Sequence, residues 1–349
     1  MKRQRKRVTT LKDIALATGY SVNTVSRALR GKDDISEEAT ERIRRKAEEL
    51  GYVNNTIASS LRLGYTNTLA VILGDISNPH FAIMTREIEN HARSKGYLAF
   101  LLNTNEDKDV ERDAIQIALN KNVDGIIICP TQEDNENIKL LMKSGVPFIQ
   151  IGRRTPELPA GYVVCDDEKG GYLAAKYLLD NGHRRILFLN APSYISSARE
   201  REAGFYRAFS ECGLSAEDAL VREISLERDN VGEVLESLFE QRTQFTAVFG
   251  FSDSVAWKAW SWFDEHGYRV PEDFSIIGFD HIQSKMPVPF PLATISSYKT
   301  QMSIMAVDCI LRMIRHDAAE EKIENSCTVI GTKLVRGSTV RRIRSTKKP

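Results

Sequence analysis

The chain has 349 residues, of which 42% are hydrophobic and 27% are charged, and its formal net charge at pH 7 is +1. This length exceeds that of one small domain, so we expect two or three folding units. No apolar run approaches the roughly 18 residues of a membrane helix, and the charged start is not followed by the hydrophobic stretch of a signal peptide. We therefore expect neither export nor membrane insertion, and a cytoplasmic location.

Positive charge is concentrated near the N-terminus. Residues 1–62 hold 14 Lys and Arg against 8 Asp and Glu, a net +6, which leaves −5 for the rest of the chain. Five of the first seven residues are basic, which is typical of a flexible arm that binds phosphates by releasing counterions. A solubilising tail is the alternative. Residues 341–349 form a second basic tail, expected to be disordered and solvated.

Residues 9–31 predict two short amphipathic helices around a glycine, the pattern of a helix-turn-helix. Thr10 is placed to cap the first helix and Ser21 the second, Gly19 supplies the turn, and Gly31 stands where a helix end favours positive φ. A helical hairpin inside a larger core is the alternative. The expected buried side chains are Leu11, Ile14, Ala15 and Ala17 in the first helix, and Val25 and Leu29 in the second.

Small polar residues on the outer side of the second helix favour DNA as the partner. A major groove accepts a helix lying by its N-terminal end. Arg27 suits guanine, Asn23 adenine and Val22 a thymine methyl, while Thr24 and Ser26 suit phosphates. The complete set of expected DNA contacts is Thr10, Leu11, Ser21, Val22, Asn23, Thr24, Ser26, Arg27, Arg30, Ser36, Ala58 and Leu61.

A third helix is expected to complete a DNA-binding head of residues 1–53. Ser36 is placed at its start and Gly51 at its end. The apolar residues between them recur at helical spacing: Ala39, Ile43, Ala47 and Leu50.

A linker of residues 54–66 follows the head and contains a helical stretch of about two turns over residues 57–64. Such a helix is too short to be stable alone, so it is expected to order only on a partner. Leu61 is the candidate for a side chain that wedges into a minor-groove base step, beside a second copy at a dyad. Packing of this leucine under the body is the alternative.

From residue 67 onward, short apolar runs alternate with longer amphipathic ones. This alternation predicts two parallel, doubly wound α/β sheets. Two such sheets facing each other make a cleft at the carboxyl ends of their strands that a hinge can close. The expected strands are residues 69–73, 97–102, 125–129, 147–151, 162–165, 185–189, 220–224, 247–250 and 275–279.

The composition argues against cofactor chemistry. No two of the 21 glycines are separated by a single residue, so a dinucleotide-binding fingerprint is missing, and no lysine follows a glycine-rich phosphate loop. We therefore expect no enzyme and no cofactor, against the alternative of a nicotinamide-dependent oxidoreductase. The six histidines and five cysteines show no metal-ligand spacing, and the odd cysteine count argues against a disulfide framework. The cysteines are expected to be buried thiols.

Several separated motifs make the chain resemble the lactose and galactose repressor family of bacterial transcription regulators over residues 9–339. They are TVSR at 24–27, LGY at 50–52, ASSLR at 58–62, DISNPHF at 75–81, VDG at 123–125, GHRRI at 182–186, IGFD at 277–280 and VRGS at 335–338. The resemblance implies a homodimer with a DNA-binding head, a hinge helix, and a periplasmic-binding-protein-like body that senses a small molecule, often a sugar. A solute-binding protein without DNA function would share the body but not the cationic head.

The resemblance also implies a subdomain division and an effector site. The effector-binding and dimerisation body would span residues 67–349. Its N-subdomain would hold about residues 67–166 and 295–320, and its C-subdomain about 167–294 and 321–340. The implied effector contacts are His80, Phe81, Arg201, Ser252, Asp253 and Asp280.

The chemistry of these residues fits a sugar, because a guanidinium donates in a fixed fork, a carboxylate accepts from vicinal hydroxyls, and an aromatic face covers a ring. Asp280 as a simple cap and Arg201 in a solvated ion pair are the alternatives. Two departures from the family leave the effector open: Ser252 stands where an asparagine is common, and Lys258 where glycine is frequent. Asn54 likewise stands where a proline is usual before the hinge.

Trp257, Trp260 and Trp262 would suit a sugar-stacking platform, but their spacing favours core packing. The expected function is a sequence-specific transcriptional repressor that binds a palindromic operator as a dimer and is controlled allosterically by a sugar-like effector. Operator, effector identity, sign of the response and tetramer formation are left open by the sequence.

Overall fold

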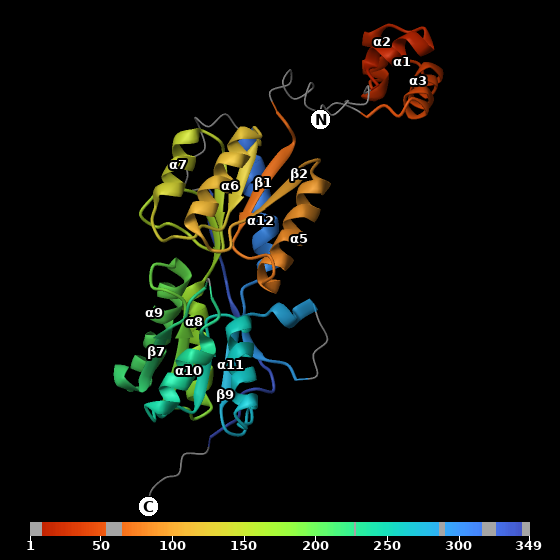
Figure 1. The fold of residues 1–349 in the computed structure, drawn as a ribbon. Coiled ribbons are helices and arrows are strands. Elements are labelled where there is room, and N and C mark those ends of the chain that lie inside the picture. The colour runs from red at the N-terminus through yellow and green to blue at the C-terminus, as the bar shows by residue number, and fades with distance from the viewer. Residues whose placement is uncertain (1–8, 54–64, 227, 286–289, 316–325, 344–349) are drawn as a thin grey trace, which may run out of the picture. The chain divides into compact units, whose positions relative to one another are not determined.

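The structure is a computed structural model that describes residues 9–53, 65–226, 228–285, 290–315 and 326–343 (Figure 1). The chain divides into two compact units, residues 1–66 and residues 67–349. The expected hinge stretch of residues 57–64, with Ala58 and Leu61, lies outside the described residues.

The described residues of the first unit form three helices, α1 (Leu11–Thr18), α2 (Val22–Leu29) and α3 (Glu37–Glu49). The expected stripe on α1 is wrong at Ala17, which is exposed because it lies off the side of the helix that carries Ile14, Ala15 and Thr18. Leu11 and Leu29 are only half-buried, and Leu50 is exposed beyond the end of α3. The core of the head consists of Ile14, Ala15, Val25, Ala28, Ile43 and Ala47.

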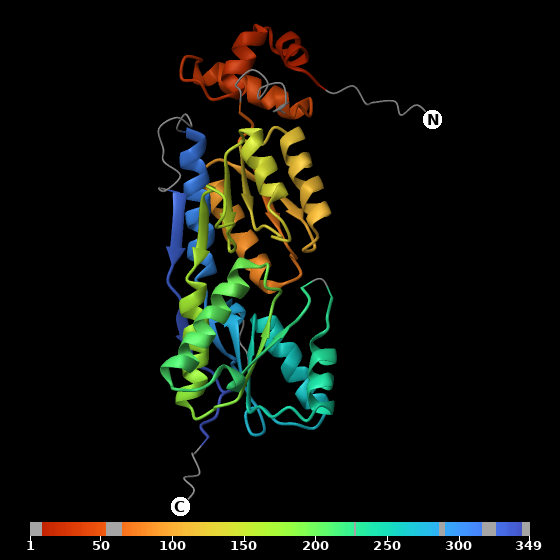
Figure 2. The same ribbon diagram turned by 90° about the vertical axis from the view of Figure 1, so that its left-hand side faces the viewer.

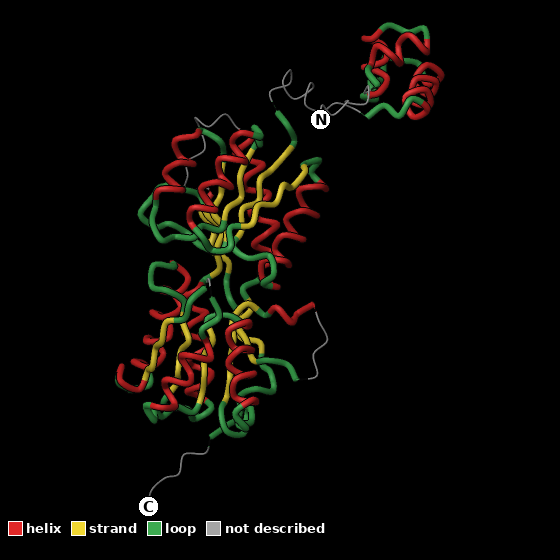
Figure 3. Tube along the Cα trace, viewed as in Figure 1, coloured by secondary structure: helices red, strands yellow, loops and turns green. Residues whose placement is uncertain are grey.

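In the part of the second unit that the structure describes, the strands form two six-stranded sheets, which appear as separate groups in Figure 3. All strand pairs of the first sheet are parallel, and their order is β11-β5-β4-β3-β1-β2. The strands are β1 (Thr68–Leu73), β2 (Leu98–Asn103), β3 (Gly125–Ile128), β4 (Phe148–Ile151), β5 (Tyr162–Cys165) and β11 (Cys327–Ile330).

Helices cover both faces of the first sheet because alternate residues of its strands point to opposite sides. Leu69, Val71 and Leu73 of β1 pack with α5 (Pro79–Ser94) and α12 (Lys299–Arg315). Ala70 and Ile72 pack on the other face with α6 (Lys108–Asn120) and α7 (Glu136–Ser144). Both faces of β1 are therefore buried, as its uninterrupted apolar sequence requires.

The second sheet has the order β12-β10-β9-β8-β6-β7, with β12 antiparallel to β10. Its strands are β6 (Ile186–Asn190), β7 (Ala219–Glu223), β8 (Ala247–Gly250), β9 (Ser275–Asp280), β10 (Ala293–Ser296) and β12 (Lys333–Val335). Its helices are α8 (Asp167–Asp180), α9 (Ser196–Glu211), α10 (Val231–Glu240) and α11 (Asp253–Glu265), with short 3-10 turns at Ala216–Asp218 and Ile282–Lys285.

The chain crosses between the two sheets after β5, after β10 and after β11. The expected return to the C-subdomain at residue 321 is wrong, because β11 pairs with β5 and therefore belongs to the first sheet. Figure 2 shows β11, in blue, at the edge of that sheet beside α12. The chain returns to the second sheet only at β12, so this boundary between the two subdomains lies between residues 330 and 333.

The cysteines differ in burial. Cys129, Cys165 and Cys309 are buried free thiols, as expected, but Cys212 is exposed and Cys327 is half-buried. Cys212 is exposed because it lies at the end of α9, outside the helix face that packs on the core.

Candidate functional site

Side chains at the helix starts fix the local geometry of the head. Thr10 and Asp13 form a capping box, in which the Thr10 N–H donates to Asp13 Oδ2 at 2.8 Å. Gly19 adopts φ 78° between α1 and α2, a conformation that favours glycine. Ser21 then caps α2 by accepting the Thr24 N–H at 3.0 Å, and Ser36 accepts from Ala39 at the start of α3. Thr10, Ser21 and Ser36 therefore have structural roles in addition to the predicted DNA contacts.

The start of α2 exposes the predicted base-reading residues. Val22 is 40% exposed and Asn23 is also exposed, while Val25 and Ala28 turn into the core. The N-terminal residues of a recognition helix contact base edges, so they have to be exposed while the other side of the helix packs on the core. The start of α2 has this arrangement. The remaining predicted contacts divide into exposed Arg30 and half-buried Leu11, Thr24 and Ser26.

Arg27 makes an ion pair with Asp34, which the sequence analysis did not single out. Its Nε donates to Asp34 Oδ1 at 3.2 Å, and a second guanidinium nitrogen contacts Oδ2. The hydrogen bond from Arg27 is the largest cause of a lowered pKa at Asp34. Both side chains are about half exposed, so this pair can exchange with another acceptor at small cost.

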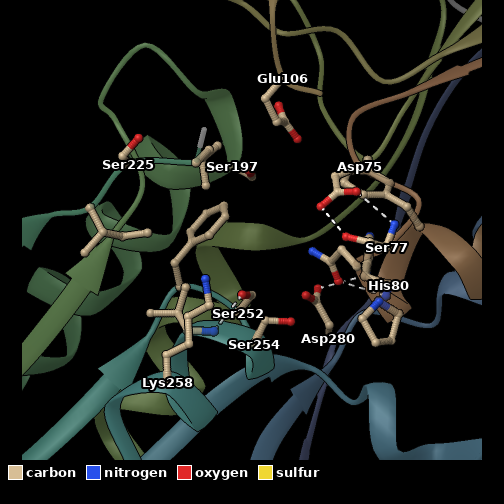
Figure 4. Close-up of a pocket in the computed structure, with 18 of the residues that line it drawn as sticks. Asp75, Ser77, His80, Glu106, Ser197, Ser225, Ser252, Ser254, Lys258 and Asp280 are labelled. Atoms are coloured by element: carbon tan, nitrogen blue, oxygen red, sulfur yellow. Dashed lines mark hydrogen bonds and ion pairs between the residues drawn. The ribbon is translucent and has the colours of Figure 1, made fainter. Parts of the chain in front are cut away.

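A cavity of about 310 Å³ lies between the two sheets of the second unit, lined by residues from both (Figure 4). Its walls come from the segments that follow β1, β2, β3, β4, β7 and β8, from the end of β9, and from the first turns of α5, α9, α10 and α11. Five of the six predicted effector residues line it: His80, Phe81, Arg201, Ser252 and Asp280.

His80 and Asp280 contact each other on one side of the cavity, His80 from α5 in the first sheet's layer and Asp280 from the end of β9 in the second sheet (Figure 4). Nδ1 of His80 lies 3.2 Å from Oδ1 of Asp280, and both side chains are largely buried. Burial by itself would raise the pKa of Asp280, but the charges of His80, Arg201 and Lys299 lower it below its ordinary value. Lys299 also donates to the Asp280 carbonyl at 2.6 Å, so an ionised carboxylate is held at the joint between the subdomains.

Arg201 lies in the cavity wall and is 6% exposed. Its Nε donates to Asp167 Oδ1 at 2.8 Å, and its Nη1 donates to the carbonyl of Phe251. The guanidinium carbon also lies 3.5 Å from the centre of the Phe279 ring. Burial raises the pKa of Asp167 to about 6, against the opposing effect of Arg201. Arg201 is therefore a buried, fixed donor and not a residue of a solvated helix face.

Close packing of α8 on α9 makes the Arg201–Asp167 pair possible. A Cβ at Gly171 would lie 2.0 Å from the Arg201 carbonyl oxygen, and one at Gly204 would lie 1.8 Å from that of Glu168. Both distances are shorter than any real contact, so only glycine at these two positions lets the helix backbones approach this closely. The glycine three residues after Arg201 thus helps to position the guanidinium.

A second buried ion pair, Arg153 with Glu106, lines the part of the cavity that belongs to the first sheet. The guanidinium donates to both carboxylate oxygens, at 2.6 and 3.0 Å, and to the Pro130 carbonyl at 3.1 Å. A Cβ at Gly74 would lie 2.2 Å from Glu106 Oε1, so glycine there leaves room for the pair.

Asp253 is absent from the described cavity lining, although it was a predicted effector contact. Its carboxylate is fully buried and accepts from the Ile282 N–H at 2.8 Å and from the Thr294 hydroxyl. Burial and the nearby Asp280 raise its pKa to about 8. Asp253 therefore supports the segment that directly follows Asp280. Ser252 lines the cavity and also caps α11 through the Val255 N–H at 3.2 Å.

Besides the His80–Asp280 contact, Gln132 and Arg154 of the first subdomain bind α9 of the second beside the cavity. Gln132, in the loop after β3, accepts with Oε1 from the Ser196 N–H at 2.9 Å and so caps α9 from the opposite subdomain. Arg154, in the loop after β4, donates to Glu200 of α9 at 2.9 and 3.1 Å. These contacts hold the cleft in its present closure, and a change of closure has to break or rearrange them.

Sequence reasoning missed most of the charged residues of the cavity. Asp75, Glu106, Arg153, Asp229 and Lys258 line it, and none of them was a predicted effector contact. Three of them directly follow strands of the first sheet, and the rule that ligands bind at the carboxyl ends of parallel strands could have identified them. Trp262 is buried in the core and the cavity lining contains no tryptophan among the described residues, in line with the expected packing role.

Two family models match the chain along nearly its whole length. The periplasmic binding proteins and sugar binding domain of LacI family match residues 66–332, and the bacterial regulatory proteins, lacI family, match residues 10–55. The chain belongs to the lacI family of bacterial regulatory proteins. It is a transcription regulator with a DNA-binding helix-turn-helix and a ligand-binding domain, and members of this family are not enzymes.

Similar curated relatives carry the name HTH-type transcriptional repressor PurR. The one from Mannheimia succiniciproducens is 32% identical over 318 residues, and the one from Aliivibrio salmonicida is 31% identical over 315. Each alignment covers 90% of this chain and 95% of the relative. The lac repressor dimer bound to operator and the anti-inducer ONPF has a similar fold, with a TM-score of 0.83 at 22% identity, covering 96% of this chain and 100% of that one.

The described residues contain no helix that is both long and apolar enough to span a membrane. Within the same residues there is also no group of three or more His, Cys, Asp or Glu side chains arranged to hold a metal ion.

Proposed function

We propose that this regulator represses transcription as a homodimer on a palindromic operator, and that a sugar-like effector in the cavity between its subdomains controls DNA affinity. The observation that carries the proposal is the presence, in one chain, of an exposed recognition helix and a polar cavity whose walls come from two hinged sheets. The relatives named as repressors align over both parts, which supports a common mechanism. The chain would meet its operator in the cytoplasm.

In the proposed complex, α2 enters the major groove by its N-terminal end. Val22, Asn23 and Arg27 contact base edges, and Arg27 exchanges the Asp34 carboxylate for the O6 and N7 acceptors of a guanine. The exchange costs little because the pair is exposed. Two heads arranged about a dyad then read two half-sites, with Leu61 as the proposed wedge between them.

In the proposed effector complex, Arg201 and Asp280 bind ligand hydroxyls from the second sheet, and His80 and Phe81 contact the ligand from the first. Because these residues come from both subdomains, ligand binding favours one closure angle over another. The Gln132–Ser196 and Arg154–Glu200 contacts define the closure that the ligand stabilises or opposes.

Effector binding and operator binding are thermodynamically coupled, so each ligand changes the affinity of the protein for the other ligand by the same factor. A nearly complete switch requires a differential affinity of about 10⁴ in total, shared over the effector sites of the dimer.

The proposal is tested by selecting duplexes from a random pool with the full-length protein. We expect enrichment of an inverted repeat, protected over both halves in footprinting at moderate ionic strength, and loss of one preferred base in each half with Arg27→Ala. A second experiment adds candidate effectors to the protein in the presence of the selected duplex. A ligand that raises the melting temperature of the protein is expected to change the affinity of the protein for the operator. Enrichment of no sequence, or of single unpaired sites, would contradict the proposal.

A further inference from the structure

The charged groups of the cavity are nearly balanced among themselves. Of the described lining residues, four are carboxylates, three are permanently charged cations, and one is His80. The carboxylates are Asp75, Glu106, Asp229 and Asp280, and the cations are Arg153, Arg201 and Lys258. A ligand anion therefore enters a site in which acidic groups outnumber the permanent cations.

Each of the three cations already has a carboxylate partner. Arg153 binds both oxygens of Glu106, as described above, and Arg201 binds Asp167 behind the wall. Lys258, on α11, lies with its Nζ 3.1 Å from Oδ2 of Asp229. An incoming phosphate or carboxylate has to share or displace these partners, whereas a hydroxyl can add to them as donor or acceptor.

Asp75 adds an acidic group without a cation to balance it. Its oxygens accept from the Ser77 N–H at 2.8 Å and from the Ser77 hydroxyl at 2.7 Å. Within the described residues, no lysine, arginine or histidine lies within ion-pair distance of Asp75. In Figure 4 it lies on the same side of the cavity as Ser77 and His80, away from Lys258.

Helix N-termini at the cleft attract anions in general, but here each has an acidic residue or a side-chain cap close by. Asp253 is the first residue of α11, which Ser252 caps, and Asp229 precedes α10 by two residues, although α10 itself has no side-chain cap. Asp75 precedes α5, where Asn78 accepts the His80 N–H. The start of α9 is capped by Gln132. These acidic residues and caps weaken the attraction of the helix ends for a ligand anion.

We propose that the effector is an uncharged, polyhydroxylated molecule, and that Asp75 together with the Lys258–Asp229 pair excludes phosphorylated and carboxylated analogues. This inference rests on the proposed function, because it concerns the same cavity. The hydroxyl groups of Ser197, Ser252 and Ser254, on the side opposite Asp75, complete a lining suited to ligand hydroxyls. Asp75 and Asp280 accept from such hydroxyls at no cost in charge repulsion.

The first test uses inorganic phosphate as the probe and calorimetric titration of the full-length protein at constant ionic strength. We expect no saturable binding to the wild type. In the double variant Asp75→Asn/Asp229→Asn, Lys258 is released and the uncompensated acid is removed, so phosphate should bind at least about tenfold more tightly than to the wild type. Asp229→Asn alone, at a 59% exposed side chain, gives the same direction in a variant whose fold is not at risk.

Asp134→Asn is the matched control. Asp134 forms the same kind of exposed ion pair with Lys108, at 2.9 Å, in the other subdomain, and neither residue lines the cavity. This control should leave phosphate binding as in the wild type. Equal phosphate affinity in the wild type and the cavity variants, or an equal gain in the control, would overturn the proposal.

The second test compares neutral sugars with their charged counterparts, such as glucose with glucose 6-phosphate and glucuronate, or ribose with ribose 5-phosphate, by thermal shift. We expect stabilisation from a neutral member of the panel and none from its charged counterparts. A charged member as the tightest ligand, or no neutral ligand at all, would overturn this inference. Operator binding is measured in a separate experiment. An absence of sequence-specific DNA binding would contradict the proposed regulatory function, whereas the ligand titrations test the preference for uncharged ligands independently of DNA.

Discussion

The head and the body each depend on an arginine paired with an aspartate, but the two pairs differ in burial. Arg27 and Asp34 lie seven residues apart, and their side chains are 45% and 52% exposed. Arg201 and Asp167 lie 34 residues apart, and theirs are 7% and 3% exposed. The exposed pair can exchange partners when DNA arrives, whereas the buried pair is part of the structure that shapes the cavity.

This difference explains how one chain can separate two tasks. A residue that contacts DNA bases must present its charge to the DNA, and breaking its ion pair with its own carboxylate must cost little free energy. A positioning residue in a cavity must keep one orientation, and burial among Phe279, Phe251 and Asp167 fixes the Arg201 guanidinium.

The largest expected effect comes from removing one partner of the buried pair. Arg201→Ala leaves the Asp167 carboxylate buried without its cation, so we expect a loss of about 3–5 kcal/mol in the free energy of unfolding. Effector binding should be lost as well, while Arg27→Ala should leave the urea unfolding curve unchanged. Comparable stability losses in the two variants would break the distinction between the pairs.

The pH dependence of stability distinguishes the buried acids of the body from the acid of the head. Asp253 has a pKa of about 8 in the folded state, above its ordinary value of 3.8, so its contribution is present at low pH and is lost as the pH rises through about 8. Compared with Asp253→Asn, we expect the wild-type unfolding free energy to fall more steeply between about pH 5 and pH 8, by up to about 1.4 kcal/mol per pH unit.

Asp34 should behave in the opposite sense. Its pKa is lowered by Arg27, so its contribution is present above its ordinary pKa and is lost as the pH falls through the lowered value. Urea titrations of Asp34→Asn should therefore converge with the wild type at low pH, where Asp34 is protonated in both states, and any difference in stability between the two should be confined to higher pH. Parallel pH profiles for wild type and Asp253→Asn would show that the buried carboxyl does not carry this dependence.

A smaller effect is expected from Arg27→Ala in DNA recognition. Loss of a bidentate guanine contact should relax discrimination at one position of each half-site by about 1–3 kcal/mol. Competition binding with single-base variants of the selected operator measures this directly. Asp34→Asn is the matched variant, since it frees Arg27 and should keep the base preference; unchanged discrimination with Arg27→Ala would exclude the proposed contact.

The smallest expected effect concerns the contact between the subdomains. Gln132→Ala removes the side-chain oxygen that caps α9, so we expect a stability loss of about 0.5–2 kcal/mol. The same change should alter effector affinity, because the cap joins the two subdomains that line the cavity. Gln241→Ala, at the exposed end of α10, serves as the control. An effector affinity identical to wild type would remove Gln132 from the coupling.

Local patterns predicted much of the fold. The strands β1 to β5 of the first sheet were expected within about one residue of their observed ends, because each is a short apolar run bounded by polar residues, as at residues 69–73 and 125–129. β10, β11 and β12 were not predicted, since each has only three or four residues and β12 contains Lys333. Their pairing depends on partners far away in the chain, which local periodicity cannot supply.

The candidate sites differ in the same way. The recognition helix could be predicted because its caps, turn and exposed side lie within about twenty residues of sequence. The cavity could be predicted only at positions that match family motifs, such as His80 and Asp280. Its other charged residues, for example Glu106 and Lys258, meet only through the topology of the two sheets, and Asp253 was misplaced because its carboxylate turns away to Ile282 and Thr294.

The most direct test of the account is a stoichiometric titration of the selected palindrome with the full-length protein, followed by fluorescence anisotropy with and without the neutral ligand found by thermal shift. The account predicts two chains per duplex, much weaker binding to an isolated half-site, and a change in operator affinity on adding the ligand that Arg201→Ala and Asp280→Ala abolish. One chain per duplex, or an operator affinity that the ligand leaves unaltered, would contradict it.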